Sequence, residues 1–153
     1  KNLIMIHVFP HIMYCLSVWG GANKIQLARI QKVINFAARI AAGTRRTDRI
    51  GPTLQALGWE RVERLVEIKD AVKVHSVLHR EAGPAAIRSM FVTRSAISSR
   101  STRSTDAGRL GLPWCRLACT QRYFRYRAVA TWNRLSPDVA GIESERAFKR
   151  AIR

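Results

Sequence analysis

The 153-residue chain has the length of one domain, and its 47% hydrophobic content is enough for a core, which argues against a fully disordered chain. Its formal net charge of +17 is uneven, because residues 1–59 carry a net +7, residues 60–81 are neutral and residues 82–153 carry a net +10. Arginine outnumbers lysine 21 to 6. Since guanidinium groups bind phosphate bidentately, this excess of arginine favours nucleic acid as the partner. Basic segments that bind a membrane surface are typically amphipathic helices or lysine-rich runs beside a lipid anchor, and neither is clear in this sequence.

The cysteines and the apolar runs exclude two further classes of protein. Three cysteines at irregular spacing make no disulfide framework, which is typical of a reducing compartment. The longest apolar run, residues 12–22, is too short to cross a bilayer. The chain begins at Lys1 in the middle of an apolar pattern without a helix cap, so we expect a fragment of a longer protein.

The N-terminal part predicts helices. Residues 2–19 are nearly all apolar and predict two short buried helices, with a break at Phe9 caused by Pro10. Residues 24–42 have the clearest amphipathic period in the chain, between a predicted N-cap and a predicted C-cap glycine. The buried stripe of this helix is predicted to consist of Leu27, Ile30, Ile34, Ala37 and Ala41. The opposite arc carries Arg29, Lys32 and Arg39, either as a solvated face or as phosphate ligands.

The middle of the chain predicts a structural helix and a basic loop. Residues 60–79 form a neutral helix with favourable charges at both ends and ion pairs along its length. Residues 93–108 lack an apolar period and predict a mobile basic loop that holds Arg94, Arg100 and Arg103. The other expected elements are a basic loop at 44–51, a helical turn at 52–57, a short helix at 85–91, a strand or hairpin at 110–117 and a last helix at 144–152.

Function is most strongly indicated in residues 116–137, where arginines alternate with aromatic residues at helical spacing. A helix at 121–135 is predicted to bury a stripe made of Phe124, Ala128, Trp132 and Leu135. Arg122, Tyr123, Arg125 and Tyr126 fall mostly outside that stripe. Arginine binds phosphate and tyrosine stacks on bases, so this face suits nucleic acid. The alternative is a core helix with a solvated basic face.

The charge of this region is expected to have no partner within the chain. Between Arg88 and Arg134 the sequence has ten arginines and one acidic residue, Asp106. The other acids are largely committed to the neutral helix. We therefore expect these arginines to face water, a missing part of the protein, or phosphate.

Several motifs, in order, resemble one family. They are PHIMYCLSVWGG at 10–21, LARIQKVINFAARIAAG at 27–43, LGWERVERL at 57–65, LGLPWCRLACTQRYFRYRAVATWNRLSP at 110–137 and AFKRAIR at 147–153. This series resembles the C-terminal part of the reverse transcriptase of jockey-like non-LTR retrotransposons. The positions that match the family's closing pattern are Phe124, Tyr126, Trp132, Asn133, Leu135, Pro137, Phe148 and Lys149.

The resemblance implies helices just after the polymerase palm, where a thumb subdomain would lie. Polymerase chemistry in this family uses an aspartate pair and a third aspartate to hold two Mg²⁺ ions. This sequence contains no adjacent acidic pair. We therefore expect a chain that is not an enzyme on its own and has no cofactor, with Mg²⁺ bound only by the parent RNA-directed DNA polymerase.

The expected fold is mainly α, a small helical bundle with a minor β-hairpin near 110–118 and a basic loop. The expected segments are a thumb-like helical segment at 1–81, a basic mobile linker at 82–109 and a basic C-terminal helical module at 110–153. The expected partners are an RNA template, RNA-DNA or DNA duplex, and the palm and fingers of the same polypeptide, with no membrane. The sequence alone does not give the location, and the family resemblance implies an intracellular one, in the cytoplasm or the nucleus.

The expected function is to hold template and primer through phosphate contacts and aromatic stacking. The alternative is a structural fragment whose basic surface packs on the missing palm. The candidate nucleic-acid-binding residues are Arg29, Lys32, Arg39, Arg94, Arg100, Arg103, Arg116, Arg122, Tyr123, Arg125, Tyr126 and Arg127.

One metal site is a weaker alternative. Cys115 and Cys119 stand four residues apart, as do His75 and His79, and such pairs can each present two ligands on a helix. The cysteine spacing is not that of a usual zinc knuckle, and each pair also fits a core or helix-end position. We therefore expect no metal.

Overall fold

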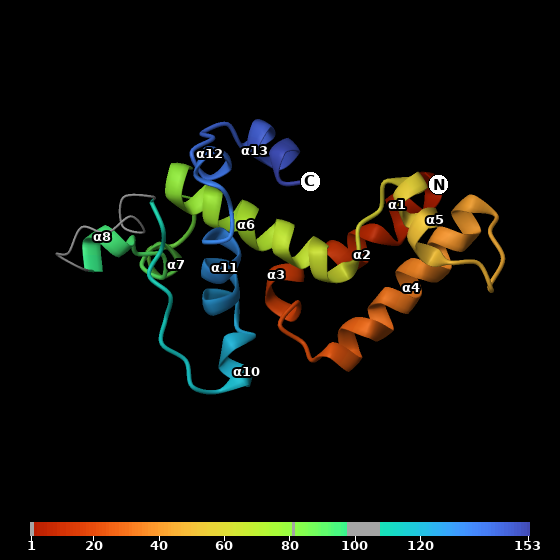
Figure 1. Ribbon diagram of the computed structural model, residues 1–153, viewed down its shortest axis with the longest axis horizontal. Coiled ribbons are helices and arrows are strands. Elements are labelled where there is room, and N and C mark those ends of the chain that lie inside the picture. Colours follow the sequence, from red (N-terminus) through yellow and green to blue (C-terminus); the bar gives the residue numbers. More distant parts are fainter. Residues whose placement is uncertain (1, 81, 98–107) are drawn as a thin grey trace. The chain divides into compact units, whose positions relative to one another are not determined.

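The computed structural model describes residues 2–80, 82–97 and 108–153, and the regular structure of these residues is helical (Figure 1). The predicted mainly α class is confirmed. The chain divides into two compact units, residues 1–66 (unit 1) and residues 67–153 (unit 2), each with its own apolar cluster. This division follows packing, whereas the expected segments at 1–81, 82–109 and 110–153 follow charge and composition.

Unit 1 is built around one long helix. Its elements are α1 (Asn2–His7), α2 (Phe9–Met13), α3 (Leu16–Trp19), α4 (Lys24–Ala42), α5 (Ile50–Leu57) and the first turn of α6 (Val62–Arg80). The bounds of α4 agree with the sequence prediction. Asn23 caps its start by accepting a hydrogen bond from the Gln26 amide at 2.9 Å, and Gly43 ends it in the left-handed conformation.

The apolar N-terminal segment forms three short helices rather than the two predicted. Pro10 lies in the first turn of α2, where a missing N–H leaves no hydrogen bond unmade, so the break precedes Phe9. Phe9 then packs edge-on against Trp59, with ring centroids 4.8 Å apart. The core of unit 1 also contains Leu16 and Ile34, which are buried.

Unit 2 packs short helices against the remainder of α6. These helices are α7 (Ala85–Arg88), α8 (Arg94–Ile97), α10 (Ala118–Gln121), α11 (Phe124–Trp132), α12 (Pro137–Ala140) and α13 (Glu145–Ala151). Its core contains Val74, Phe91, Leu110, Trp132 and Phe148, all buried. The predicted stripe of residues 121–135 is confirmed, because Ala128 and Trp132 are buried and Phe124 and Leu135 pack against the same cluster.

The predicted hairpin at 110–118 is wrong, since the described residues contain no strand. The segment is extended, and one isolated bridge joins Thr93 to Leu110. The Asn133 side chain replaces a neighbouring strand: its carbonyl oxygen accepts from the Leu110 amide and its amide donates to the Leu110 carbonyl, both at 2.9 Å. Leu110 is therefore hydrogen-bonded without a sheet.

The predicted helix at 121–135 is also interrupted. Tyr123 is extended, with φ −66° and ψ 149°, and separates α10 from α11. The Arg127 side chain donates to the carbonyl oxygen of Arg122 at 2.8 Å, so this carbonyl is hydrogen-bonded at the break.

Among the described residues, none of the helices combines the length and apolar character needed to cross a membrane.

Candidate nucleic-acid interface

The extended segment before α10 is fixed at both ends within unit 2. The Asn133 side chain is hydrogen-bonded to both the amide and the carbonyl group of Leu110, and the Gly111 amide donates to the Val92 carbonyl at 2.8 Å. At the other end, the Gln121 side chain donates to the Cys115 carbonyl at 3.4 Å. The backbone of this segment is therefore anchored by hydrogen bonds at both of its ends.

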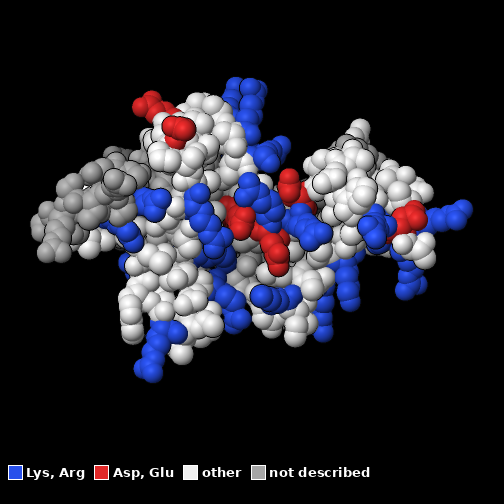
Figure 2. Space-filling view, viewed as in Figure 1, with Lys and Arg blue, Asp and Glu red and all other residues white. Residues whose placement is uncertain are grey.

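This segment, α10 and the start of α11 expose a mixture of basic, aromatic and apolar side chains. We call it the α10 surface, and its members are Leu112, Trp114, Arg116, Leu117, Arg122, Tyr123 and Arg125, all exposed. Residues 108–137 contain six arginines and no acidic residue. Figure 2 shows basic and uncharged atoms, and no acidic ones, at the end of unit 2 that carries α10. The predicted exposure of Arg116, Arg122, Tyr123 and Arg125 is confirmed.

Arg127 does not belong to this surface, and the expectation that no partner within the chain neutralises these arginines is wrong. Its Nε donates to Asp70 Oδ2 at 2.5 Å and a terminal nitrogen donates to Asp70 Oδ1 at 3.3 Å. The Asp70 side chain is fully buried and that of Arg127 is 17% exposed. Asp70 lies on the buried side of α6, and this bidentate pair with Arg127 compensates its charge.

Two further residues of this region, the candidate Tyr126 and the neighbouring Arg134, are less available than the sequence indicates. Tyr126 is half-buried on α11. Arg134, in the turn after α11, is exposed and forms an ion pair with Glu67 at 3.7 Å. An exposed pair of this kind contributes little stability. In α8, Arg94 is exposed. Arg100 and Arg103 lie outside the described residues.

In unit 1, α4 places its basic residues beside apolar ones. Arg29 and Lys32 are exposed as predicted. Arg39 is half-buried, and its terminal nitrogen donates to the Asp48 carbonyl at 3.3 Å, so it braces the loop after α4 instead of standing in solvent. The same exposed face carries a stripe of large apolar side chains, which we call the α4 stripe: Ile25, Val33, Phe36 and Ile40.

Sequence reasoning missed two features here, the α4 stripe and Trp114. The α4 stripe follows a second helical period on the face opposite the core, and this period was readable. Trp114 gives no periodic signal because it lies in an extended segment. Its exposure follows from the hydrogen bonds of Asn133 and Gln121, which join residues distant in sequence.

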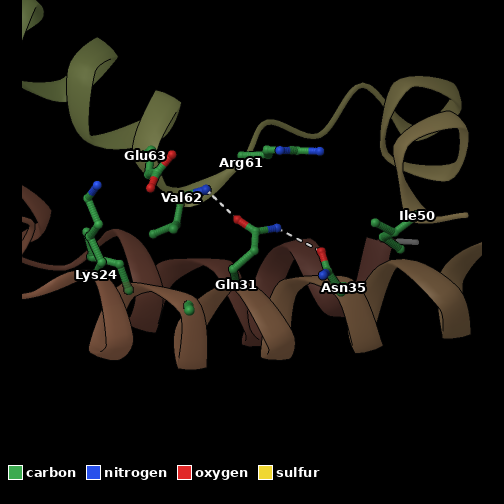
Figure 3. A pocket seen from close by; sticks show the side chains of 9 residues that line it. Lys24, Gln31, Asn35, Ile50, Arg61, Val62 and Glu63 are labelled. Atoms are coloured by element: carbon green, nitrogen blue, oxygen red, sulfur yellow. Dashed lines mark hydrogen bonds between the residues drawn. The ribbon is translucent and has the colours of Figure 1, made fainter.

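Unit 1 also contains an open groove of about 310 Å³. It is lined by Lys24, Leu27, Ala28, Gln31, Asn35, Ile50, Arg61, Val62 and Glu63. In Figure 3, Gln31 points across the groove, where it accepts from the Val62 amide and donates to Asn35 Oδ1, both at 2.8 Å. These polar groups fix the start of α6 on α4, so the groove has a structural explanation.

The alternative zinc set is not assembled. Cys115 lies in the extended segment and Cys119 is exposed on α10, and the described residues contain no cluster of three potential ligands. His75 is fully buried, stacks on Phe148 at a centroid distance of 4.3 Å, and donates from Nε2 to the Ile142 carbonyl at 2.6 Å. Burial lowers the pKa of His75 from its ordinary value of 6.5.

The ion pairs near His75 tie α13 to α6. Arg80 donates to Glu145 at 2.5 Å, and Lys149 donates to the same carboxylate. Hydrogen bonds from Lys149 and Arg80 lower the pKa of Glu145.

Comparison of the chain with protein-family models, with curated proteins and with solved structures finds no match.

Proposed function

We propose that this chain is a non-catalytic nucleic-acid-binding part of a retrotransposon RNA-directed DNA polymerase, which holds template and primer for an active site elsewhere in the parent protein. The observation that carries the binding proposal is the α10 surface, where arginines and aromatic side chains are exposed together in a stretch without acids. The identity of the parent rests on the motif resemblance alone.

The chemistry of the α10 surface suits a polyanion with flat apolar groups. Arg116, Arg122 and Arg125 would contact phosphates, and each contact would release a counterion. Tyr123 is 66% exposed and offers a ring on which a base can stack. The chain has no adjacent acidic pair, so we assign it no polymerase chemistry of its own.

The test compares two pairs of arginines that carry the same charge. Arg122→Ala with Arg125→Ala removes two charges from the α10 surface, and Arg146→Ala with Arg150→Ala removes two exposed charges from α13. Binding of the whole 153-residue chain to RNA and to duplex is measured by fluorescence anisotropy. We expect a large loss of affinity for the first pair and a small loss for the second.

Equal losses for the two pairs would mean that net charge alone causes binding, and the proposed interface would be abandoned. Circular dichroism of both variants checks that the fold persists. Because both variants have the same net charge, a difference in their affinities reports the position of the removed charges.

A second candidate function is favoured by the α4 stripe. Ile25, Val33, Phe36 and Ile40 are between 52% and 70% exposed on one face of α4, and such a stripe marks a docking surface. The function would then be to pack unit 1 against another part of the parent polymerase. Phe36→Gln with Ile40→Gln should reduce binding of an apolar dye by the isolated chain while leaving nucleic-acid affinity unchanged. If dye binding is as strong in this variant as in the parent chain, the α4 stripe is not the docking surface.

A further inference from the structure

Trp114 differs from the other three tryptophans of the chain. Trp59 and Trp132 are buried, and Trp19 packs against the core of unit 1 and donates from its indole N–H to the Tyr14 carbonyl at 2.7 Å. Trp114 is 86% exposed, the largest value among the large hydrophobic side chains that the structure describes. A large apolar ring held in water is costly, so it requires an explanation.

The position of Trp114 is constrained on both sides. Leu110 and Gly111 are hydrogen-bonded to Asn133 and Val92 before it, and Cys115 is hydrogen-bonded to Gln121 directly after it. Pro113 further restricts the backbone of the preceding residue. The ring is therefore presented from a fixed backbone, which reduces the entropy lost when a ligand binds to it.

The charges around Trp114 select the type of ligand. Arg116 and Arg122 are exposed on the same surface, and residues 108–137 contain no acid that could repel a phosphate. The indole ring of Trp114 can stack only on a flat ring whose face is accessible. In a duplex the faces of the bases are already covered by their neighbours in the helix. An unpaired base beside a phosphate offers both features.

The local structure does not favour an anionic membrane as the partner. Interfacial membrane binding uses an amphipathic helix that lies in the plane of the headgroups. Here the exposed apolar residues lie on an extended segment and on α10, which has four residues. The basic residues of this surface are all arginines, whose planar groups match phosphate and also stack on bases.

We infer that Trp114 is a stacking platform for an unpaired base, with Arg116 and Arg122 on the flanking phosphates, so that the α10 surface takes single-stranded nucleic acid in preference to duplex. This inference rests on the proposed nucleic-acid binding and names the form of nucleic acid that the same surface takes. Tyr123 provides a second exposed ring on this surface.

The experiment compares the whole chain with Trp114→Ala and with Trp114→Phe, which keeps an aromatic face. Tyr14→Ala serves as the control, since Tyr14 is 76% exposed in unit 1. The probes are a single-stranded oligonucleotide of roughly 15 nucleotides, in RNA and in DNA, an abasic oligonucleotide of the same length, a duplex, and vesicles of anionic lipid.

We expect Trp114→Ala to weaken single-strand binding about 5- to 150-fold, the range that corresponds to one stacked base. The slope of log affinity against log salt should not change, because no charge is removed. Trp114→Phe should restore most of the affinity, and Tyr14→Ala should behave like the parent chain. Duplex and abasic affinities should be the same for the parent chain and for Trp114→Ala. Indole fluorescence should be quenched by the single strand in the parent chain and much less in Trp114→Phe.

Different failures have different meanings. If the parent chain binds nucleic acid with a clear salt dependence and Trp114→Ala has no effect, or weakens duplex equally, this inference is overturned and the proposed function stands. If the parent chain binds neither single strands nor duplex, the proposed function fails and the inference fails with it. Binding to vesicles that depends on Trp114, without binding to oligonucleotides, would assign the surface to a membrane instead.

Discussion

Arg125 and Arg127 lie two residues apart on α11, and the structure predicts opposite consequences when each is replaced by alanine. Arg127 forms the bidentate pair with the fully buried Asp70, with its shorter contact at 2.5 Å. Arg125 is exposed on the α10 surface. Arg127→Ala should therefore impair folding, whereas Arg125→Ala should impair binding.

The size of the folding effect follows from burial. Without the guanidinium group, the Asp70 carboxylate stays in the interior after losing its bidentate cation, and breaking a buried pair in this way costs about 3–5 kcal/mol. Arg125→Ala removes an exposed group and should change the free energy of unfolding by about 0.5 kcal/mol or less. Because Arg127 and Asp70 interact directly, the double variant with Asp70→Ala should cost less than the sum of the single ones.

Urea unfolding followed by circular dichroism measures these differences, and titrations of RNA at several salt concentrations measure binding. Where Arg127→Ala remains folded, it should keep the salt slope of the parent chain. Arg125→Ala should reduce the magnitude of the slope by about 0.7, the value for one phosphate on a single strand. The reasoning would be refuted if Arg127→Ala left stability unchanged and reduced affinity as Arg125→Ala does.

Three further predictions concern folding. Asn133→Ala leaves the buried amide and carbonyl of Leu110 without their side-chain partner, so it should destabilise the chain by about 1–3 kcal/mol per group in urea unfolding, and unchanged stability would contradict the role given to Asn133. Gly20→Ala should destabilise unit 1, because a Cβ there would lie 2.5 Å from the Leu16 carbonyl oxygen and 2.7 Å from a Val66 methyl, while Gly51→Ala, with open space around it, should not. The free energy of unfolding should decrease as pH falls below about 6.5, because His75 has a lowered pKa in the fold and the unfolded chain takes up its proton first. The charged and titratable groups near His75 are His79, Arg80 and Glu145, and both variants of the test keep them. The free energy of unfolding in urea should depend less on pH in His75→Gln than in the control His7→Gln.

Local patterns in the sequence were sufficient for the long helices. The capped, periodic run of α4 was predicted with its correct bounds, because its cap residues and its apolar period are local features. The bounds of α6 and α13 were predicted nearly as well from acidic residues in the first turn and basic residues in the last turn, which are also local. The hairpin at 110–118 was wrong because the partner of Leu110 is not a strand but the side chain of Asn133, 23 residues later.

The candidate interface was predicted in part for the same reason. Exposure of Arg122 and Arg125 follows from helical spacing, which is a local property. The burial of Arg127 depends on Asp70, 57 residues earlier in the chain, and no local pattern distinguishes it from its neighbours. Trp114 could be located in the sequence, but its exposure depends on how distant residues fix the segment that carries it.

The central claim, that this chain binds nucleic acid through phosphates on the α10 surface, is tested most directly by the salt dependence of its affinity for single-stranded RNA. If the three exposed arginines of this surface, Arg116, Arg122 and Arg125, each neutralise one phosphate, log affinity should fall linearly with log salt with a slope of about −2. An affinity that does not change between about 50 and 200 mM salt, or the absence of binding at the lower concentration, would contradict the claim.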